Sequence, residues 1–467
     1  MGVTTENLGT LLAEAAGRFG FAELLSQAHS MRAALVQAGC AAHEPVHVRV
    51  SNQPHDLAAY LGVWLAGGVV VPVQRSSPQG AVSHILSKTR ARFEWDGALK
   101  SINEENLPRR PILEGAALIV FTSGSSGMPK GAVLSHSAFA GKLAAIQSLL
   151  CFEPADRTLL VLNITFSFGL WVALLTLLHG GALLMRERFS AGGFMKDLET
   201  EKATRVAVVP TMMRSLILDL PQERLEAEGR RLAAGGALRQ VLIGGETLGK
   251  GLGETLRSLF APAGLVDIYG LTETSTCDFF LTPADAARYA GCIGRPSPGV
   301  RYRIAEDGEL WISSPFLMNG YLDEPGLEPI VDGWLGTGDL ARERDPGVVE
   351  IGGRKKELIY RGGNKIAPLE IEFACSAHPK VAAALAVGRP DQRLGQRIHA
   401  LVVPRDPGLG AAELRAFLRE RLDKHKHPDV LYFASELPAG RTGKADRGRF
   451  AAMLERGELK PAEGDTR

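Results

Sequence analysis

Apolar side chains in the first hundred residues alternate between helical and strand-like spacing. Residues 8–40 and 55–68 repeat apolar positions every three or four residues, which predicts helices with one buried face. Residues 46–50 and 69–73 are short apolar runs of the kind that forms buried strands. The order of these elements predicts βαβ units.

The same order returns in the middle of the chain. Strand-like runs at 203–209 and 240–243 are followed by Pro210 and by Gly244-Gly245, respectively. We therefore expect an α/β fold with doubly wound sheets, in which ligands bind at the carboxyl ends of the strands.

The pattern changes after residue 290. Short alternating runs such as 300–304 and 309–313, separated by Gly, Pro and Asp, predict a small β-barrel or β-subdomain. A charged cluster follows Gly352-Gly353, and we place a domain boundary near 352–357.

The apolar pattern of the C-terminal part predicts a smaller α+β unit, with helices at 368–377 and 411–423 and a strand at 398–404. The domains are thus expected at 1–353 and 357–467. The last ten residues lack an apolar period and are expected to be frayed.

Composition excludes several classes of protein. The chain has 467 residues, 45% hydrophobic and 22% charged, as is ordinary for a globular enzyme. A net charge of +1 provides no general field for nucleic acid or anionic lipid. Five scattered cysteines without a C-x-x-C pair, and an N-terminus without a signal sequence, predict a cytoplasmic protein with reduced thiols.

One uncharged stretch, 158–185, is long enough to span a bilayer. Asn163, Gly169 and Gly180 interrupt it. We therefore predict no membrane span, but a buried strand, loop and helix.

A loop rich in glycine and hydroxyl groups follows the apolar run 116–121. Its glycines allow the backbone to approach an anion, its hydroxyls donate, and Lys130 adds a positive charge, so the loop suits a phosphate. A plain surface loop is the alternative. A Walker loop does not match, because Gly131 stands where Ser or Thr is required, and no G-x-S-x-G elbow is present.

A second polar segment, 267–274, ends another predicted strand. It provides an aromatic ring at Tyr269, a hydroxyl at Thr272 and a carboxylate at Glu273. This set suits a purine, a phosphate and a hard cation, although an ordinary turn capped by Thr is the alternative.

The sequence resembles the adenylate-forming superfamily of acyl- and aryl-CoA synthetases, peptide-synthetase adenylation domains and luciferases. The resemblance rests on these two segments and on Gly244-Gly245-Glu246, 333–339, 353–357 and 437–447. The resemblance runs from about residue 8 to residue 450 and is greatest to small bacterial acid–CoA ligases. The stretch 88–115 is shorter than is usual in the family.

The resemblance implies a site for ATP and Mg²⁺. Tyr269 would stack on adenine, Thr272 would contact the α-phosphate, Glu273 would hold the metal, and Asp339 and Arg354 would contact the ribose or phosphates. The full set of residues implied to bind the nucleotide is Thr122, Ser123, Gly124, Ser125, Ser126, Gly127, Lys130, Gly244, Gly245, Glu246, Tyr269, Gly270, Thr272, Asp339 and Arg354.

The resemblance also implies catalysis by a mobile C-terminal domain. Lys444 would bridge the attacking carboxylate and the α-phosphate, and Thr272 and Glu273 would assist it. Lys356 would be the hinge about which this domain swings. Gly362 and Gly363 would then line a channel for the acceptor.

The residues implied to line the acyl pocket are Phe166, Phe168, Gly169, Met212, Gly270 and Ser275. Relatives that activate amino acids carry Asp at the position of Gly169, and many CoA synthetases carry His at Phe166. We therefore expect an uncharged aryl, alicyclic or medium acyl acid rather than an α-amino acid.

The leading hypothesis is an acid–thiol ligase that forms acyl-AMP and pyrophosphate, and then transfers the acyl group to CoA or to carrier-protein phosphopantetheine. An amide synthetase, in which an amine intercepts the adenylate, is the alternative within the superfamily. A non-catalytic adenylate-binding protein is the alternative outside enzymes.

Overall fold

Parallel strands build the first of two large sheets. The structure is a computed structural model that describes residues 7–103, 110–122, 129–324, 329–440 and 444–462. The order of sheet A is β16-β6-β5-β2-β1-β3-β4. Its strands are β1 (Pro45–Val50), β2 (Val69–Gln74), β3 (Phe93–Trp95), β4 (Leu99–Ser101), β5 (Ala116–Thr122), β6 (Lys130–Ser135) and β16 (Gly320–Tyr321). The central strands β5, β2, β1 and β3 run parallel.

The second sheet repeats this plan. The order of sheet B is β13-β12-β11-β10-β9-β7-β8. Its strands are β7 (Arg157–Leu160), β8 (Ala182–Met185), β9 (Arg205–Val208), β10 (Gln240–Gly244), β11 (Gly264–Tyr269), β12 (Phe279–Leu281) and β13 (Arg295–Pro296). All strands from β11 to β8 are parallel, so their carboxyl ends meet at one edge.

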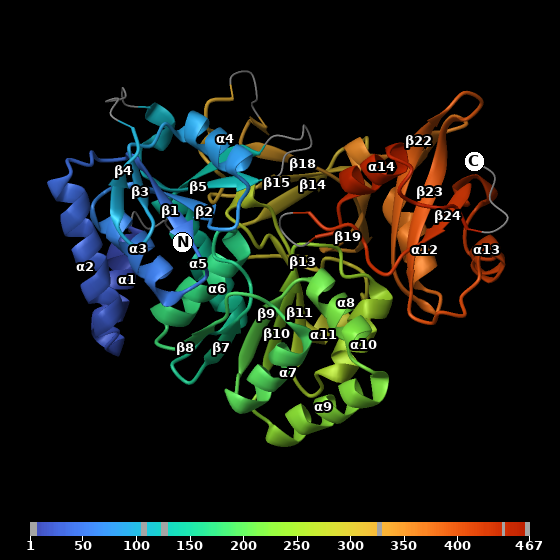
Figure 1. Cartoon of the computed structure of the whole chain (residues 1–467), viewed down its shortest axis with the longest axis horizontal. Coiled ribbons are helices and arrows are strands. Elements are labelled where there is room, and N and C mark those ends of the chain that lie inside the picture. The colour runs from blue at the N-terminus through green and yellow to red at the C-terminus, as the bar shows by residue number, and fades with distance from the viewer. Residues whose placement is uncertain (1–6, 104–109, 123–128, 325–328, 441–443, 463–467) are drawn as a thin grey trace.

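Helices cover both faces of each sheet (Figure 1). Those between the sheets are α1 (Leu8–Phe19), α3 (Pro54–Leu65), α5 (His136–Leu150) and α6 (Ser167–Leu178), with α2 (Ala22–Gln37) beside α3. Those on the outer faces are α4 (Gln79–Thr89) on sheet A, and α7 (Ala191–Thr200), α8 (Pro210–Asp219), α9 (Gln222–Gly235) and α10 (Lys250–Leu259) on sheet B. One core spans both sheets, because α6 is apolar on every side.

The predicted doubly wound sheets are therefore confirmed. The uncharged stretch 158–185 folds as β7, a loop, α6 and β8, as expected. Among the described residues, no helix is long and apolar enough to cross a membrane. The five cysteines are free thiols, which agrees with the prediction.

A third, antiparallel sheet forms the predicted β-subdomain. The order of sheet C is β14-β15-β18-β17, with β19 paired to β18. Its strands are β14 (Arg301–Ile304), β15 (Glu309–Ser313), β17 (Ile330–Val331), β18 (Trp334–Asp345) and β19 (Val348–Arg354). Among the described strands this order is an open path, whereas a barrel would close on itself.

The C-terminal part is a separate α+β layer. The order of sheet D is β21-β20-β23-β22, with β24 paired to β23. Its elements are β20 (Ile359–Arg361), β21 (Asn364–Ile366), α12 (Pro368–Ser376), β22 (Val381–Asp391), β23 (Gly395–Pro404), α13 (Ala411–Arg419), β24 (Val430–Phe433) and α14 (Arg447–Glu455). It has its own core.

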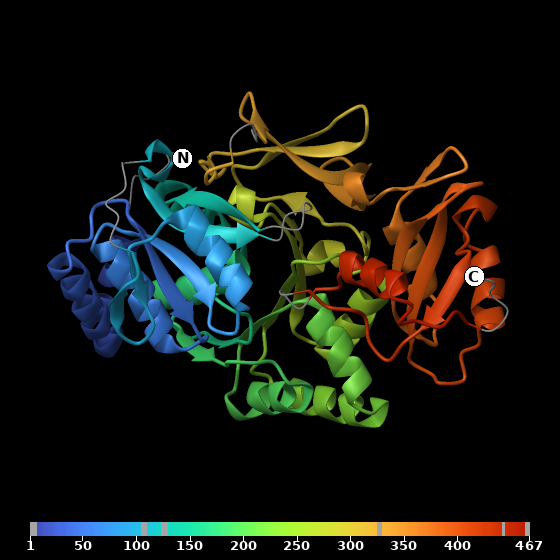
Figure 2. The same cartoon turned by 45° about the horizontal axis from the view of Figure 1, so that its top comes forward.

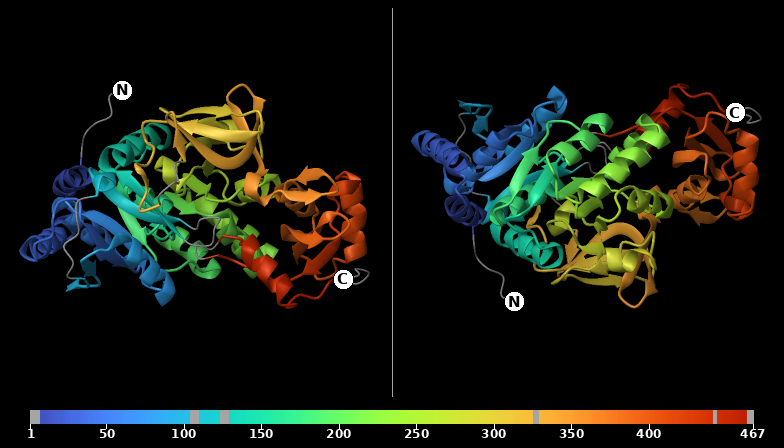
Figure 3. Two further views of the ribbon diagram at one scale, coloured as in Figure 1. Left: turned by 90° about the horizontal axis from the view of Figure 1, so that it is seen from above. Right: turned by 90° about the horizontal axis from the view of Figure 1, so that it is seen from below.

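This C-terminal part stands at one end of the molecule, next to α8 and α10 (Figure 2). Views from above and below show the same arrangement (Figure 3). A short turn, η3 (Lys355–Glu357), joins it to β19. A Cβ atom added to Gly249, at the start of α10, would lie 3.3 Å from the ring of Phe373 in α12. The two parts are therefore in direct contact.

The expectation of a frayed C-terminus is wrong for residues 458–462. The N–H of Ala462 donates to the carbonyl of Leu431 at 2.8 Å, and Pro461 forms a β-bridge with Tyr432. Leu459 packs against the core cluster that contains Tyr432 and Phe450. The edge strand β24 supplies backbone partners that the apolar pattern did not reveal. Residues 463–467 lie outside the described residues.

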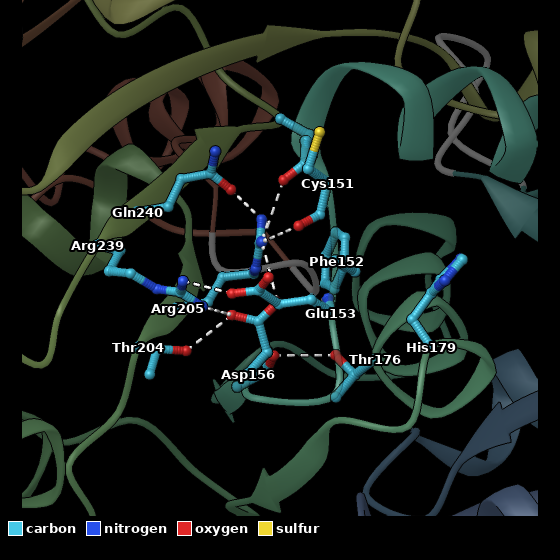
Figure 4. Close-up of polar contacts among 12 residues, drawn as sticks. Cys151, Phe152, Glu153, Asp156, Thr176, His179, Thr204, Arg205, Arg239 and Gln240 are labelled. Atoms are coloured by element: carbon cyan, nitrogen blue, oxygen red, sulfur yellow. Dashed lines mark hydrogen bonds and ion pairs between the residues drawn. The ribbon is translucent and has the colours of Figure 1, made fainter. Parts of the chain in front are cut away.

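A buried polar network aligns the first residues of β7, β9 and β10 (Figure 4). The Arg205 guanidinium donates to Asp156 at 3.1 Å and to the carbonyls of Leu150 and Cys151, and it lies 3.8 Å from the Phe152 ring centroid. Asp156 also accepts from Arg239 at 2.8 Å. These groups sit at the amino ends of the strands, so they set strand register at the edge opposite the ligand-binding edge.

Candidate active site

The predicted nucleotide-binding residues meet at the carboxyl ends of β10 and β11. Gly245 follows β10, Tyr269 ends β11, and Thr272 and Glu273 lie in the single turn η2 (Thr272–Thr274) directly after it. Sheet C adds Asp339 from β18. The parallel topology therefore gathers at one edge residues that lie far apart in the sequence.

Asp339 is held by two donors. The Tyr269 hydroxyl donates to Oδ2 at 2.6 Å, and Nε of Arg354 donates to Oδ1 at 2.8 Å. Asp339 and Arg354 are cross-strand neighbours in β18 and β19. Burial, reinforced by Asp339, raises the pKa of the Tyr269 hydroxyl well above its usual value, so that this group remains a donor. Each carboxylate oxygen keeps one further lone pair for a ligand hydroxyl.

The C-terminal part delivers Lys444 to the same edge. A Cβ atom added to Gly245 would lie 3.2 Å from Cε and 3.3 Å from Nζ of Lys444. Gly245 also has a φ of +87°, a conformation that favours glycine. The backbone conformation at this position therefore favours glycine, and the end of the Lys444 side chain packs against it.

The charges around Lys444 are mixed. Burial lowers the pKa of its amine, Glu246 opposes this shift, and Arg354 adds to it. Glu246 is itself held by α8, because Arg214 donates to its Oε2 at 2.9 Å and the Thr211 hydroxyl donates to its Oε1. Residues 441–443, which precede Lys444, lie outside the described residues.

Thr211 and Arg214 were not found by sequence reasoning. Their signal was their place in the helix that begins at Pro210, directly after β9 and therefore at the ligand-binding edge. Glu246 was predicted through its backbone, whereas the structure shows a side chain with defined partners.

Glu273 has a partner that the sequence did not indicate. The Tyr321 hydroxyl donates to its Oε1 at 2.6 Å. Tyr321 lies in β16, next to β6, and Nζ of Lys130 lies 5.7 Å from its ring centroid. The predicted phosphate lysine and the predicted metal carboxylate are thus both neighbours of Tyr321.

The loop predicted to bind phosphate joins β5 to β6. Ser123, Gly124, Ser125, Ser126 and Gly127 lie outside the described residues. The hydroxyl of Thr122, the last residue of β5, lies 3.5 Å from the carbonyl of Lys130. The two ends of the loop are therefore adjacent.

A buried ion pair supports the turn that carries Thr272 and Glu273. Lys142 of α5 and Asp278 are both 0% exposed, and Nζ lies 2.9 Å from Oδ1. Asp278 also accepts from the backbone N–H of Leu271 and from the Thr274 hydroxyl. Three successive residues of this turn, Ser275, Thr276 and Cys277, have positive φ angles. The ion pair thus holds a backbone conformation that side chains disfavour.

This turn carries two residues predicted for the acyl pocket, and that role stays a prediction. Ser275 is fully buried and its hydroxyl donates to the carbonyl of Phe316 at 2.7 Å, so that hydroxyl is already engaged. A Cβ atom at Gly270 would lie 2.2 Å from the backbone N of Cys277. Gly270 is therefore needed for the turn itself, as sequence spacing alone could not show.

Phe168 and Met212 lie where an acyl pocket was predicted. The Phe168 ring stacks on Trp171 at 5.4 Å and would lie 3.3 Å from a Cβ atom at Gly244. Met212 packs against both large cores. Phe166 is half-buried and precedes the first residue of α6. Phe168 thus gives the edge beside Gly244 an apolar neighbour.

Gly169 faces backbone and not open space. A Cβ atom there would lie 2.5 Å from the carbonyl oxygen of Asn163, so an Asp at this position would not fit. The loop before α6 is fixed by Asn52, which donates to the carbonyl of Leu162 and accepts from the N–H of Ile164. This crowding gives a steric reason why the chain lacks the Asp that would pair with the ammonium group of an α-amino acid substrate.

The predicted hinge and acceptor residues are exposed. Lys356 lies in η3, and Gly362 and Gly363 form the turn between β20 and β21 with φ of 58° and 81°. The neighbouring Arg361 forms a bidentate ion pair with Asp429, with hydrogen bonds of 2.7 and 3.1 Å. Its charge is therefore already engaged within the C-terminal part.

Comparison with known proteins identifies the family. The model of the AMP-binding enzyme family matches residues 9–105 and 91–322, and the model of the AMP-binding enzyme C-terminal domain matches residues 370–444. The chain belongs to the AMP-binding enzymes. The prediction of the adenylate-forming superfamily, made from its motifs, is confirmed.

Similar AMP-binding enzymes include two curated ligases. A sulfoacetate–CoA ligase of Cupriavidus necator is 32% identical over 91% of this chain and 91% of its own length. An indoleacetate–CoA ligase of Aromatoleum aromaticum is 31% identical over 81% of this chain and 73% of its own length. These relatives support the predicted acid–thiol ligase of the AMP-forming kind.

The fold also matches solved structures. The amide bond synthetase McbA of Marinactinospora thermotolerans superposes with a TM-score of 0.82 at 24% identity, over 93% of this chain and 94% of that one. The predicted fold class, a large N-terminal domain and a smaller C-terminal one, is thereby confirmed.

The Lys142–Asp278 pair yields a test. Lys142→Met leaves a buried carboxylate without its cation, so we expect a loss of about 3–5 kcal/mol in stability and a clear fall in the midpoint of thermal unfolding. The double variant with Asp278→Asn should recover part of this loss. Lys100→Met, which breaks an exposed pair with Asp96, is the matched control. Equal midpoints for Lys142→Met and Lys100→Met would contradict the role assigned to the buried pair.

Proposed function

We propose that this AMP-binding enzyme joins a carboxylic acid to ATP, releases pyrophosphate, and passes the acyl group of the resulting acyl-AMP to the thiol of CoA. The position of Lys444 supports this most directly. Its amine lies on Gly245 at the end of β10, on the same edge as Tyr269 and Glu273. A lysine in that place can meet both a carboxylate and an α-phosphate.

The first half-reaction needs charge neutralisation. A carboxylate is already ionised near neutral pH, so no general base is required. It must approach a polyanion, and cations positioned beforehand lower that barrier. Lys444 and Lys130 supply this positive charge. Thr272 supplies a hydroxyl donor, and Tyr269 and Asp339 orient the nucleoside.

The residues present fit Mg²⁺. This ion prefers oxygen ligands, and it is commonly bound by one or two carboxylates together with substrate phosphates and water. The described residues hold no cluster of three or more protein ligands for a metal. Glu273 offers one carboxylate whose Oε1 is fixed by Tyr321. When bound there, Mg²⁺ would neutralise phosphate charge.

The acid is proposed to be uncharged and apolar, aryl, alicyclic or medium acyl. The predicted lining residues Phe166, Phe168 and Met212 are apolar, and Phe168 lies beside Gly244. This set suits an aromatic acid such as the one named for the indoleacetate relative. Gly169 excludes an Asp that could pair with an α-ammonium group.

The acceptor is proposed to be CoA, because the curated relatives are named as CoA ligases. A carrier-protein thiol would use the same chemistry. An amine is the alternative, since an amide bond synthetase shares the fold.

A panel of acids tests the function. The protein is incubated with ATP, Mg²⁺ and single aryl, alicyclic, acyl or α-amino acids, and pyrophosphate is measured. AMP release is then compared with CoA, holo carrier protein or amines as the acceptor. We expect pyrophosphate with an apolar acid and fast AMP release with CoA. No pyrophosphate with any acid would contradict the proposal, and preference for an amine would replace CoA by the alternative.

Replacing Lys444 should separate the two half-reactions. Lys444→Ala removes a charge contact to the reacting groups, so acyl-adenylate formation should fall about a hundred- to thousandfold. Transfer from a supplied acyl-adenylate to the acceptor should be retained. Lys250→Ala, at an exposed lysine of α10, is the control. Wild-type pyrophosphate exchange by Lys444→Ala would remove this residue from the mechanism.

We also propose that the parts 1–353 and 357–467 rotate about Lys356 between the half-reactions, since the acceptor must reach an adenylate that Lys444 covers. Lys356→Pro fixes φ and should impede this rotation. We expect adenylation to be nearly unchanged and thioester formation to fall, whereas Lys356→Ala should preserve both. Equal loss of both half-reactions in Lys356→Pro would show a structural role alone.

A further inference from the structure

Tyr321 connects three segments of the active site. Its strand β16 pairs antiparallel with β6, which begins at Lys130. The N–H of Leu322 donates to the carbonyl of Gly131, and the N–H of Met318 donates to the carbonyl of Glu273, both at 2.8 Å. Backbone hydrogen bonds on the two sides of Tyr321 thus join this segment to β6 and to Glu273.

The hydroxyl of Tyr321 makes a short contact with Glu273. The distance of 2.6 Å to Oε1 is typical of an O–H group that donates to a carboxylate. The hydroxyl is therefore the donor in this contact, and the carboxylate accepts.

The ring of Tyr321 has a second neighbour. Nζ of Lys130 lies 5.7 Å from the ring centroid, within the range of a cation–π contact. Although Lys130 and Glu273 flank the same side chain, no ion pair joins them. The side chain of Tyr321 thus contacts a lysine through its ring and a carboxylate through its hydroxyl.

We propose that Tyr321 is the positioning residue for Glu273 and keeps this carboxylate and Lys130 apart, so that both remain available to a metal-bound triphosphate. This inference rests on the proposed function. One oxygen of Glu273 is fixed by the hydroxyl, which restricts the side-chain rotamer and leaves the other oxygen to a divalent cation. Lys130 is held over the ring, where its charge still faces an incoming phosphate.

Tyr321→Phe tests the proposal, because it removes only the hydroxyl and keeps the ring beneath Lys130. The Mg²⁺ concentration that gives half-maximal pyrophosphate exchange should rise roughly tenfold, the scale of one hydrogen bond to a charged group. The rate at saturating Mg²⁺ should stay close to that of the wild type. An unchanged Mg²⁺ dependence would overturn the proposal.

Tyr302→Phe is the matched control. The Tyr302 hydroxyl donates to Oε1 of Glu343 at the same distance of 2.6 Å, on the surface of sheet C. It should leave the Mg²⁺ dependence unchanged. If Tyr302→Phe shifted that dependence as far as Tyr321→Phe, the effect would not be specific to Glu273, and the proposal would fail.

A binding measurement keeps the test independent of turnover. Mn²⁺ bound in the presence of a non-hydrolysable ATP analogue is followed by electron paramagnetic resonance. Tyr321→Phe should weaken Mn²⁺ binding, and in a variant that already carries Glu273→Gln it should have little further effect. Fully additive losses would overturn the proposal. A wild type that binds Mn²⁺ and ATP but adenylates no acid would instead contradict the proposed function alone.

Discussion

The contact between Lys444 and the end of β10 is the interaction on which this active site depends. The nucleotide-side residues come from sheets A, B and C, but the lysine comes from the C-terminal part. Its amine packs against Gly245, which has a positive φ angle and no side chain to crowd it. The site is therefore completed by the way in which the two parts of the chain lie together.

The carboxylates of this site are already engaged by neutral or cationic donors. Asp339 is held by Tyr269 and Arg354, Glu246 by Thr211 and Arg214, and Glu273 by Tyr321. None of the ion pairs among the described residues uses Lys130 or Lys444. The acids are thus fixed by other partners. In the proposed reaction, these two lysines would neutralise the polyanion that a carboxylate must approach.

Much of the fold and of the site was predictable from the sequence. The run of strands and helices gave the doubly wound sheets, since buried parallel strands are continuous apolar runs. The motif 267–274 placed Tyr269 at the end of a strand and Glu273 just after it, as in the structure, whereas Asp339 lies within β18. The contact of Tyr321 with Glu273 was not predictable, because β16 is a two-residue strand without an apolar pattern of its own.

Other features were hidden for a common physical reason. Ser275, Gly270 and Gly169 stay predictions for the acyl pocket, but the carbonyl of Phe316, the backbone N of Cys277 and the carbonyl of Asn163 lie close beside them. Such backbone approaches leave no periodic signal. The ion pair of Lys142 with Asp278 was likewise hidden, because a single lysine in an amphipathic helix looks like an exposed one.

The most direct test of the account is chemical labelling of lysines by an acyl-phosphate derivative of ATP, which transfers its acyl group to amines beside the bound nucleotide. The modified peptides are identified by mass spectrometry, with and without competing ATP. The account predicts that Lys444 is acylated and that ATP protects it, whereas the exposed Lys250 is labelled slowly and without protection. Labelling of Lys444 at the rate of Lys250, unaffected by ATP, would contradict it.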